Sequence, residues 1–333
     1  MIGWDVGGAH LKAARINASG DVEAAIQVPC ALWRGLTELH HALDIAMAQL
    51  GASRSHAVTM TGEMVDLFPD RQTGVLEIAR TMRQRFGDDI RFYCGHGGFV
   101  GFDRVAERSA DIASANWRAT AEIVAKRIAR TVFVDIGSTT TDIIAIVDHQ
   151  AQCKGHDDYS RLVAGELVYC GVVRTPLMAL ANRVDFCGEK VPVIAEHFAT
   201  TADIYRVLDE LPDEVDQHPS ADGAEKTKIA SARRLARMIG RDLESADWNG
   251  WRDLAKAFRV AQIAKIGEAL DVVGKHQSMI VGAGIGDFLI REIAMSRGWE
   301  YRSFAQLLNL SETVSQKSTQ VAPAVAVALL ALE

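Results

Sequence analysis

Two short loops carry the side chains best suited to bind a phosphorylated ligand. Asp5 and Gly7 follow one apolar run, and Asp135 and Gly137 follow another 130 positions later. Glycine lets the backbone approach a phosphate closely, successive backbone amides bind anions, and an aspartate can hold a magnesium ion directly or through water. A single Asp-x-Gly is a common turn, but two matched copies predict a two-part phosphate and metal site.

Polar residues around these glycines extend the prediction. Lys12 and His10 leave the first loop on one face of a strand, because strand side chains alternate, and a cation there would neutralise a phosphate. The alternative is a solvated lysine beside a surface histidine, since lysine is mostly exposed in proteins. We expect phosphate binding by Gly7, Gly8, His10, Lys12, Gly137, Ser138, Thr139 and Thr140, and metal binding by Asp5 and Asp135.

Strands and helices must hold these loops in place. Apolar, β-branched runs on both sides of each loop indicate a strand, a tight polar turn and a second strand. Residues 196–244 are polar, have helical spacing and lack strand signals, so they predict an inserted helical subdomain. The other predicted elements are strands over 11–17, 21–28, 57–61, 90–94 and 278–281, an extended stretch over 161–173, and helices over 36–50, 73–86, 111–127, 251–273, 287–295 and 321–332.

Composition bounds the classes of function. A chain of 333 residues is long enough for two domains with separate cores. Its 48% hydrophobic and 24% charged residues are typical of a soluble globular protein, and its net charge of −7 gives no electrostatic footprint for nucleic acid or an anionic membrane. A small-molecule partner is expected instead.

Cysteine usage and the apolar segments predict a cytoplasmic location. The five cysteines are scattered without a CxxC pair, which argues against a disulfide framework or a structural zinc site. The first residues lack the basic and apolar regions of a signal peptide. The longest apolar run, 321–332, contains Pro323 and is too short to span a bilayer.

A glycine-rich turn at residues 282–286 follows a predicted strand and precedes a predicted helix, a natural place for an anion or nucleotide. The order of loop, loop and glycine turn resembles the actin, Hsp70 and sugar-kinase superfamily. That resemblance implies an α/β fold with two ribonuclease-H-like domains around a central cleft. We expect residues 1–130 in the first domain and 131–333 in the second, with a helical insertion at about 194–245.

The segment 164–176, AGELVYCGVVRTP, narrows the resemblance. It is similar to the hallmark of hydantoinase and oxoprolinase-like proteins linked to tetrahydromethanopterin one-carbon transfer, a group that includes an enzyme of methanofuran (methylofuran) biosynthesis. Supporting segments lie at 61–68, 114–120, 198–203 and 236–242. The resemblance implies a magnesium-dependent transferase whose partners are a furan diphosphate and a phenolic amine, joined as an aryl ether with release of diphosphate.

The resemblance also suggests roles for individual residues. Glu166 and Glu63 are candidate bases, although Glu166 could simply pair with Arg174, and Glu63 could belong to a helix start. We interpret His156, Asp157 and Asp158 as a solvated loop, because adjacent side chains diverge. The expected catalytic residues are Glu166, Glu63 and Lys12, and the expected substrate-binding residues are Asn116, Tyr169, Arg174, Gly282 and Gly284.

Other functions fit the same fold. One is an ATP-dependent small-molecule kinase or a hydantoinase-type amide hydrolase, for which the glycine turn would contact adenosine. Another is a catalytically silent, nucleotide-responsive scaffold, which gives the segment around Glu166 no role. A homo-oligomer is compatible with either, and the sequence leaves the oligomeric state open.

Overall fold

A computed structural model describes residues 1–333, with the exception of the side chain at position 213. The first sheet has the strand order β3-β2-β1-β4-β5-β6. Strand β1 pairs antiparallel with β2 and parallel with β4, so the first two strands form the predicted hairpin around residues 7–9. The strands are β1 (Ile2–Val6), β2 (His10–Ile16), β3 (Val22–Pro29), β4 (His56–Met60), β5 (Ile90–Tyr93) and β6 (Phe99–Val100).

The second sheet repeats this topology. Its order is β10-β8-β7-β13-β14, with β9 on the same side of β8 as β10. Strand β7 pairs antiparallel with β8 and parallel with β13, as β1 does with β2 and β4. The strands are β7 (Arg130–Ile136), β8 (Thr141–Val147), β9 (Gln150–Gln152), β10 (Leu167–Val168), β13 (Met279–Ala283) and β14 (Glu300–Ser303). The sequence repeat is therefore a repeat of structure.

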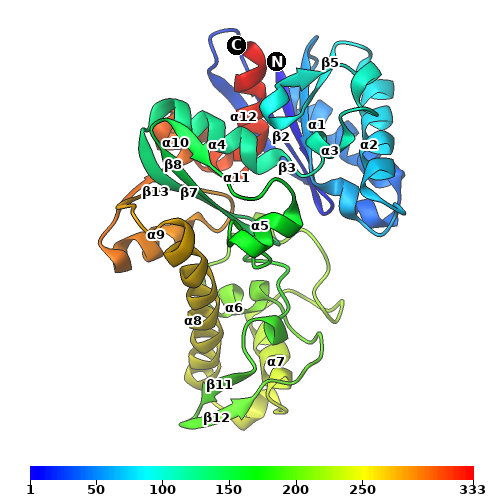
Figure 1. The fold of residues 1–333 in the computed structure, drawn as a ribbon. Helices are drawn as coiled ribbons and strands as arrows, with labels where there is room; N and C mark the ends of the chain where they lie inside the picture. Colours follow the sequence, from blue (N-terminus) through cyan, green and yellow to red (C-terminus); the bar gives the residue numbers. More distant parts are fainter.

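Two helices cross between the halves of the chain (Figure 1). Helix α4 (Asn116–Arg127) comes from the first half but contacts β7, β8 and β9 of the second sheet. Helix α12 (Ala322–Leu332) ends the chain but contacts β1, β2 and β4 of the first sheet, and it packs against α4. Helix α12 is buried along nearly its whole length, as its alanine-rich apolar sequence predicts. The C-terminal helix therefore packs on the first sheet. The domain boundary at residue 130 remains a prediction.

The other helices cover the outer faces and build the insertion. Helices α1 and α2 lie against the first sheet, whereas α8 and α9 lie against the second. The insertion projects from the second sheet at the bottom of Figure 1 and contains α6, α7 and an isolated hairpin, β11–β12. The bounds are α1 (Leu36–Leu50), α2 (Arg71–Phe86), α3 (Ser109–Ile112), α5 (Asp158–Ala164), α6 (Thr201–Leu208), α7 (Lys228–Met238), α8 (Trp248–Val273), α9 (Asp287–Arg297), α10 (Phe304–Leu307), α11 (Glu312–Gln320), β11 (Arg183–Phe186) and β12 (Glu189–Pro192).

Most predicted elements are confirmed, and two predictions are corrected. The helix predicted over 111–127 is broken into α3 and α4, because Ser114 between them takes a left-handed φ of 50°. The stretch predicted as extended over 161–173 begins inside α5, which Asp157 caps by accepting a hydrogen bond from the Ser160 amide at 2.8 Å. The region predicted to be helical over 196–244 contains α6 and α7, and the β11–β12 hairpin precedes it. No helix in the described chain is long and apolar enough to cross a membrane.

Candidate active site

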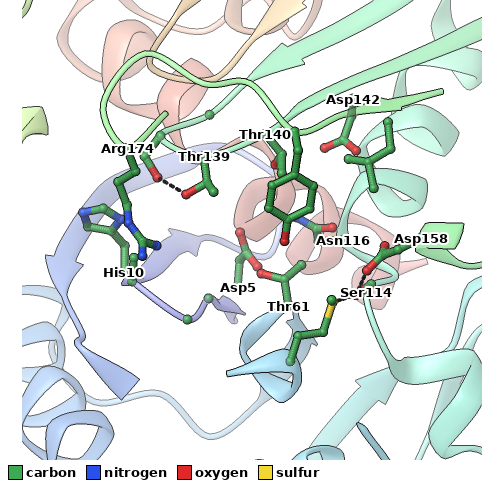
Figure 2. A pocket seen from close by; sticks show the side chains of 18 of the residues that line it. Asp5, His10, Thr61, Ser114, Asn116, Thr139, Thr140, Asp142, Asp158 and Arg174 are labelled. Atoms are coloured by element: carbon green, nitrogen blue, oxygen red, sulfur yellow. Dashed lines mark hydrogen bonds between the residues drawn. The ribbon is translucent and has the colours of Figure 1, made fainter. Parts of the chain in front are cut away.

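A cavity of about 320 Å³ lies between the two predicted loops. In Figure 2, His10 and Arg174 lie at one end, Ser114 and Asp158 lie at the other, and Asp5 lies between them. The structure therefore brings the two copies of the repeat to one site. The lining consists of Asp5, Gly7, Gly8, Ala9, His10, Lys12, Thr61, Met64, Val65, Ser114, Asn116, Gly137, Ser138, Thr139, Thr140, Asp142, Asp158, Arg161, Leu167, Tyr169 and Arg174.

The two loops close in the same way. The amide of Gly7 donates to the His10 carbonyl at 3.0 Å, and the amide of Gly137 donates to the Thr140 carbonyl at 2.9 Å. Each loop is therefore a tight turn between antiparallel strands. All eight predicted phosphate-binding residues line the cavity.

Asp5 and Lys12 face each other across β1 and β2. Their Cα atoms are partners in the strand register, and Lys12 Nζ lies 3.7 Å from Asp5 Oδ2. Burial raises the pKa of Asp5 above its ordinary value, although Lys12 opposes that shift. The other oxygen, Asp5 Oδ1, is buried and has no hydrogen-bond partner among the described residues. A cation would supply the missing partner.

Asp135 lies behind the second loop and does not line the cavity. Burial raises its pKa to about 7, Lys12 opposes the shift, and the carboxylates of Asp142 and Asp5 add to it. The glycine turn packs directly against it, because a Cβ on Gly284 would lie 2.3 Å from Asp135 Oδ1. Asp135 is thus close enough to the site to feel its charges, but Asp5 is the predicted metal ligand that reaches the cavity.

This arrangement would suit a magnesium ion that the protein holds together with a phosphorylated ligand. Within the described residues, no three His, Cys, Asp or Glu side chains gather into a metal site. Magnesium in phosphate-binding enzymes is usually held by one or two carboxylates together with substrate phosphates and water. The orphaned oxygen of Asp5 provides such a partial site.

His10 and Arg174 form the basic end of the cavity. His10 is 4% exposed, and its Nε2 atom has no hydrogen-bond partner in the described structure. Burial lowers the pKa of His10 well below its ordinary value, and the nearby His218, Lys12 and Arg174 add to that effect. A neutral imidazole is expected there.

The segment 164–176 packs against the second loop. The amides of Val172 and Arg174 donate to the carbonyls of Gly137 and Ser138 at 3.0 and 2.8 Å. A Cβ on Gly171 would lie 2.4 Å from the Ser138 carbonyl carbon, so only glycine permits this approach. The segment consequently fixes Arg174 at the rim of the cavity.

Glu63 and Ser114 form the core of an acidic end. Ser114 Oγ donates to Glu63 Oε1 at 2.7 Å and lies 3.4 Å from Asp158 Oδ2. Arg71 donates to the same Asp158 oxygen at 2.6 Å. Burial raises the pKa of Glu63 to about 7, although the hydrogen bond from Ser114 opposes that shift. Ser114 also holds strained backbone here, a feature that concentrates at functional sites.

A buried ion pair supports the acidic end. Arg161 donates to Asp142 Oδ1 at 2.8 Å, and its guanidinium carbon lies 4.0 Å from the centre of the Trp117 ring. Burial raises the pKa of Asp142, and Arg161 opposes the shift. This pairing holds Asp142 at the cavity wall without leaving its charge uncompensated.

Glu166 does not line the cavity. Its carboxylate is 2% exposed and accepts hydrogen bonds from the amides of Lys154 and Gly155 at 2.6 and 3.0 Å. Both oxygens are therefore engaged in holding the 153–155 loop. Glu166 forms no ion pair with Arg174 in the part of the chain that the structure describes. The geometry gives Glu166 a structural role in holding that loop, and its catalytic role stays a prediction.

The predicted substrate-binding residues divide into two groups. Asn116, Tyr169 and Arg174 line the cavity. Gly282 and Gly284 do not line it. Both are closely packed, and a Cβ at position 282 would lie 2.5 Å from Asp287 Oδ1. Cys94 and Cys170 are buried outside the lining, and burial raises the pKa of Cys170 to about 11.

The polar lining residues that were not among the predicted site residues include Ser114, Asp142 and Asp158. The interpretation of His156 to Asp158 as a solvated loop is wrong for Asp158, which is 9% exposed. Its partner Arg71 lies 87 positions earlier, a separation that no local pattern reveals. The repeat could have identified Asp142. It lies opposite Asp135 in the second hairpin, as Lys12 lies opposite Asp5 in the first.

Comparison with known proteins places this geometry in a family. The family model described as hydantoinase/oxoprolinase matches residues 54–331. The chain belongs to the hydantoinase/oxoprolinase family. A relative from Methanocaldococcus jannaschii is 29% identical over 99% of this chain and 97% of its own, and one from Methanococcus vannielii is 30% identical over 63% of this chain and 95% of its own. Both are named (4-{4-[2-(γ-L-glutamylamino)ethyl]phenoxymethyl}furan-2-yl)methanamine synthase.

Solved structures agree on the fold of this hydantoinase/oxoprolinase family member. Component A of (R)-2-hydroxyglutaryl-CoA dehydratase from Acidaminococcus fermentans has a TM-score of 0.51 at 11% identity, covering 99% of this chain and 96% of that one. A nucleotide-free acetone carboxylase has a TM-score of 0.56 at 12% identity, covering 90% of this chain and 67% of that one. The predicted fold class, that of actin, Hsp70 and the sugar kinases, is confirmed.

Proposed function

We propose that this protein condenses an aminomethyl-furanmethanol diphosphate with the phenol of γ-glutamyltyramine, or of a tyrosine analogue, and releases diphosphate. The observation that carries the proposal is the meeting of two matched phosphate loops at one cavity. The relatives from the two methanogens are named for a product with a phenoxymethyl-furan linkage, which is the bond this reaction forms.

The reaction exchanges one carbon–oxygen bond for another. The bond between the furan methylene carbon and the bridging oxygen of the diphosphate breaks, and the phenol oxygen bonds to that carbon. The phenolic proton leaves, so the products are the aryl ether, diphosphate and a proton. Because the furan ring shares the positive charge that develops at the methylene carbon, stabilisation of the leaving group supplies much of the catalysis.

The loops and Lys12 are placed to hold the diphosphate. Residues of both turns, including Ser138 to Thr140, line the same cavity as Lys12. Preorganised donors of this kind act on charge as it develops in the transition state. A magnesium ion held by Asp5 and the phosphates would neutralise further charge on the leaving group.

Asp158 is the base that the geometry favours. Phenol titrates near pKa 10, so a positioned carboxylate contributes about 10²–10⁴-fold to its reaction. Asp158 lines the cavity, whereas the predicted base Glu63 lies behind Ser114. Glu63 then acts through Ser114 and Asp158 as a positioning residue.

Initial rates of diphosphate release test the proposal. Purified protein with magnesium should release diphosphate only when both the furan diphosphate and the phenol are present. Phosphate release from ATP at a comparable rate, without either substrate, would show the ATP-dependent alternative instead. Calorimetry with magnesium diphosphate and with magnesium ATP separates the two further, since we expect binding of diphosphate without a requirement for adenosine.

A further inference from the structure

A second cavity of about 320 Å³ adjoins the first. Arg174 lines both cavities. His10 lines the first and His218 lines the second, and the centres of their rings are 4.8 Å apart. His218 also contacts the Ala9 carbonyl through Nε2 at 2.6 Å, so the insertion reaches the first phosphate loop here. The two cavities therefore share a wall.

The acidic side chains at the second cavity are already neutralised. Asp216 pairs with Arg206 and with Lys226, whose Nζ lies 3.3 Å from Asp216 Oδ1. Asp203 pairs with Arg234 at 2.8 Å. These carboxylates are thus unavailable to a cationic ligand, and they do not offset the remaining positive charge of the lining.

Arg34 and Arg174 provide that remaining charge. Neither forms an ion pair anywhere in the part of the chain that the structure describes. The Arg174 guanidinium lies 5.2 Å from the centre of the Trp33 ring, and its backbone is tied to the second phosphate loop. Desolvation by the surrounding protein lowers the pKa of Arg174, a penalty that a bound anion would offset. Two guanidinium groups and an indole in the lining of one cavity suit a carboxylate attached to a flexible chain.

We propose that the second cavity binds the carboxylate-bearing end of the phenolic co-substrate. This inference rests on the proposed function, in which that co-substrate ends in a γ-glutamyl group with a free α-carboxylate. Arg34 and Arg174 hold the carboxylate, Trp33 packs against the tail, and the phenol extends past Arg174 into the first cavity. The second cavity thereby selects acidic phenols over phenols that lack the tail.

A comparison of two phenols tests this selection. γ-Glutamyltyramine carries the carboxylate, whereas tyramine has the same phenol without it. We expect the kcat/KM of the wild type to favour γ-glutamyltyramine by at least about tenfold, the range of a charge-assisted hydrogen bond. Arg34→Gln should reduce this ratio to within about threefold of one. Arg54→Gln, which changes another exposed arginine that lines neither cavity, should leave the ratio as it is in the wild type.

Failure of the subsite and failure of the proposed function give different results. Equal kcat/KM values for the two phenols in the wild type, or an unchanged ratio in Arg34→Gln, would overturn the proposed subsite. Ether formation in the same assays would still support the proposed function. If neither phenol releases diphosphate, the proposed function fails, and calorimetry then decides about the cavity. Tighter binding of γ-glutamyltyramine than of tyramine that disappears in Arg34→Gln would support the subsite, and equal binding would overturn it.

Discussion

Lys12 Nζ lies 3.7 Å from Asp5 Oδ2, directly across the strand register of the first hairpin. The equivalent position in the second hairpin, opposite Asp135, holds Asp142. The two halves of the repeat therefore differ in sign at this position. The first contributes a cation to the cavity lining, and the second contributes a carboxylate to it.

Lys12→Met should lower kcat/KM for diphosphate release by about 10²–10³-fold, because it removes the preorganised positive charge that stabilises the leaving diphosphate. Lys12→Arg keeps the charge and should lose less. Stopped assays of released diphosphate measure both variants. A loss below about threefold in Lys12→Met would remove this lysine from the mechanism.

Asp5→Asn should raise the magnesium concentration needed for half-maximal activity by about ten- to a hundredfold, because a neutral amide binds the ion less well than a carboxylate. The measurement is a magnesium titration of the initial rate after treatment with a chelator. Activity that survives the chelator in the wild type would contradict a role for magnesium.

Asp158→Asn and Glu166→Gln should affect different properties. Asp158→Asn removes the base at the cavity and should lower kcat by about 10²-fold or more, with little change in unfolding. Glu166→Gln weakens the acceptor of two buried amides and should lower the free energy of unfolding by about 1–3 kcal/mol, with kcat within a few-fold of the wild type. The reverse pattern would restore Glu166 as the base.

Glu63→Gln should stabilise the protein at alkaline pH. The pKa of Glu63 is raised to about 7 in the folded state, above its unfolded value of about 4.3, so the folded state binds more protons between these values. Stability of the wild type should therefore fall as pH rises through this window, by on the order of 3 kcal/mol. Urea unfolding should show Glu63→Gln more stable than the wild type at pH 8 and similar near pH 4.5. Equal stability of the two proteins at pH 8 would mean that ionisation of Glu63 does not destabilise the folded state.

Gly284→Ala should destabilise the fold more than Gly298→Ala. Both glycines have positive φ, 85° and 65°, which costs an alanine about 1–2 kcal/mol. A Cβ at position 284 would also meet Asp135 Oδ1 and the Ile136 carbonyl, both at 2.3 Å, whereas a Cβ at 298 meets nothing within 4 Å. We expect roughly 3 kcal/mol or more for Gly284→Ala, measured by urea unfolding. Similar losses in the two variants would argue against close packing at the glycine turn.

Local patterns were sufficient to predict the hairpins and their loops. A strand, a short polar turn and a second strand depend on neighbouring residues, so the sequence predicted both loops, and all eight residues expected to bind phosphate line the cavity. The repeat then indicated that the loops belong together. The exchange of α4 and α12 between the sheets depends on contacts between distant segments, and the chain order alone does not specify it.

The acidic end shows why Asp158 was not predicted as a site residue. Asp158 sits beside other polar residues, and its burial comes from α5 packing near Arg71 and Ser114. Glu166 sits in an apolar segment and attracted attention for that reason, yet its partners are the amides of the 153–155 loop. The local sequence did not reveal the surroundings of either carboxylate, because burial and the choice of hydrogen-bond partner depend on tertiary structure.

The fate of the phenol oxygen tests the central claim most directly. Turnover of furan diphosphate with γ-glutamyltyramine labelled with ¹⁸O at the phenol should give one aryl ether for each diphosphate released. Mass spectrometry should find the label wholly in the ether and absent from the diphosphate. Label in the phosphate products, or diphosphate release without ether formation, would contradict attack of the phenol on the furan methylene.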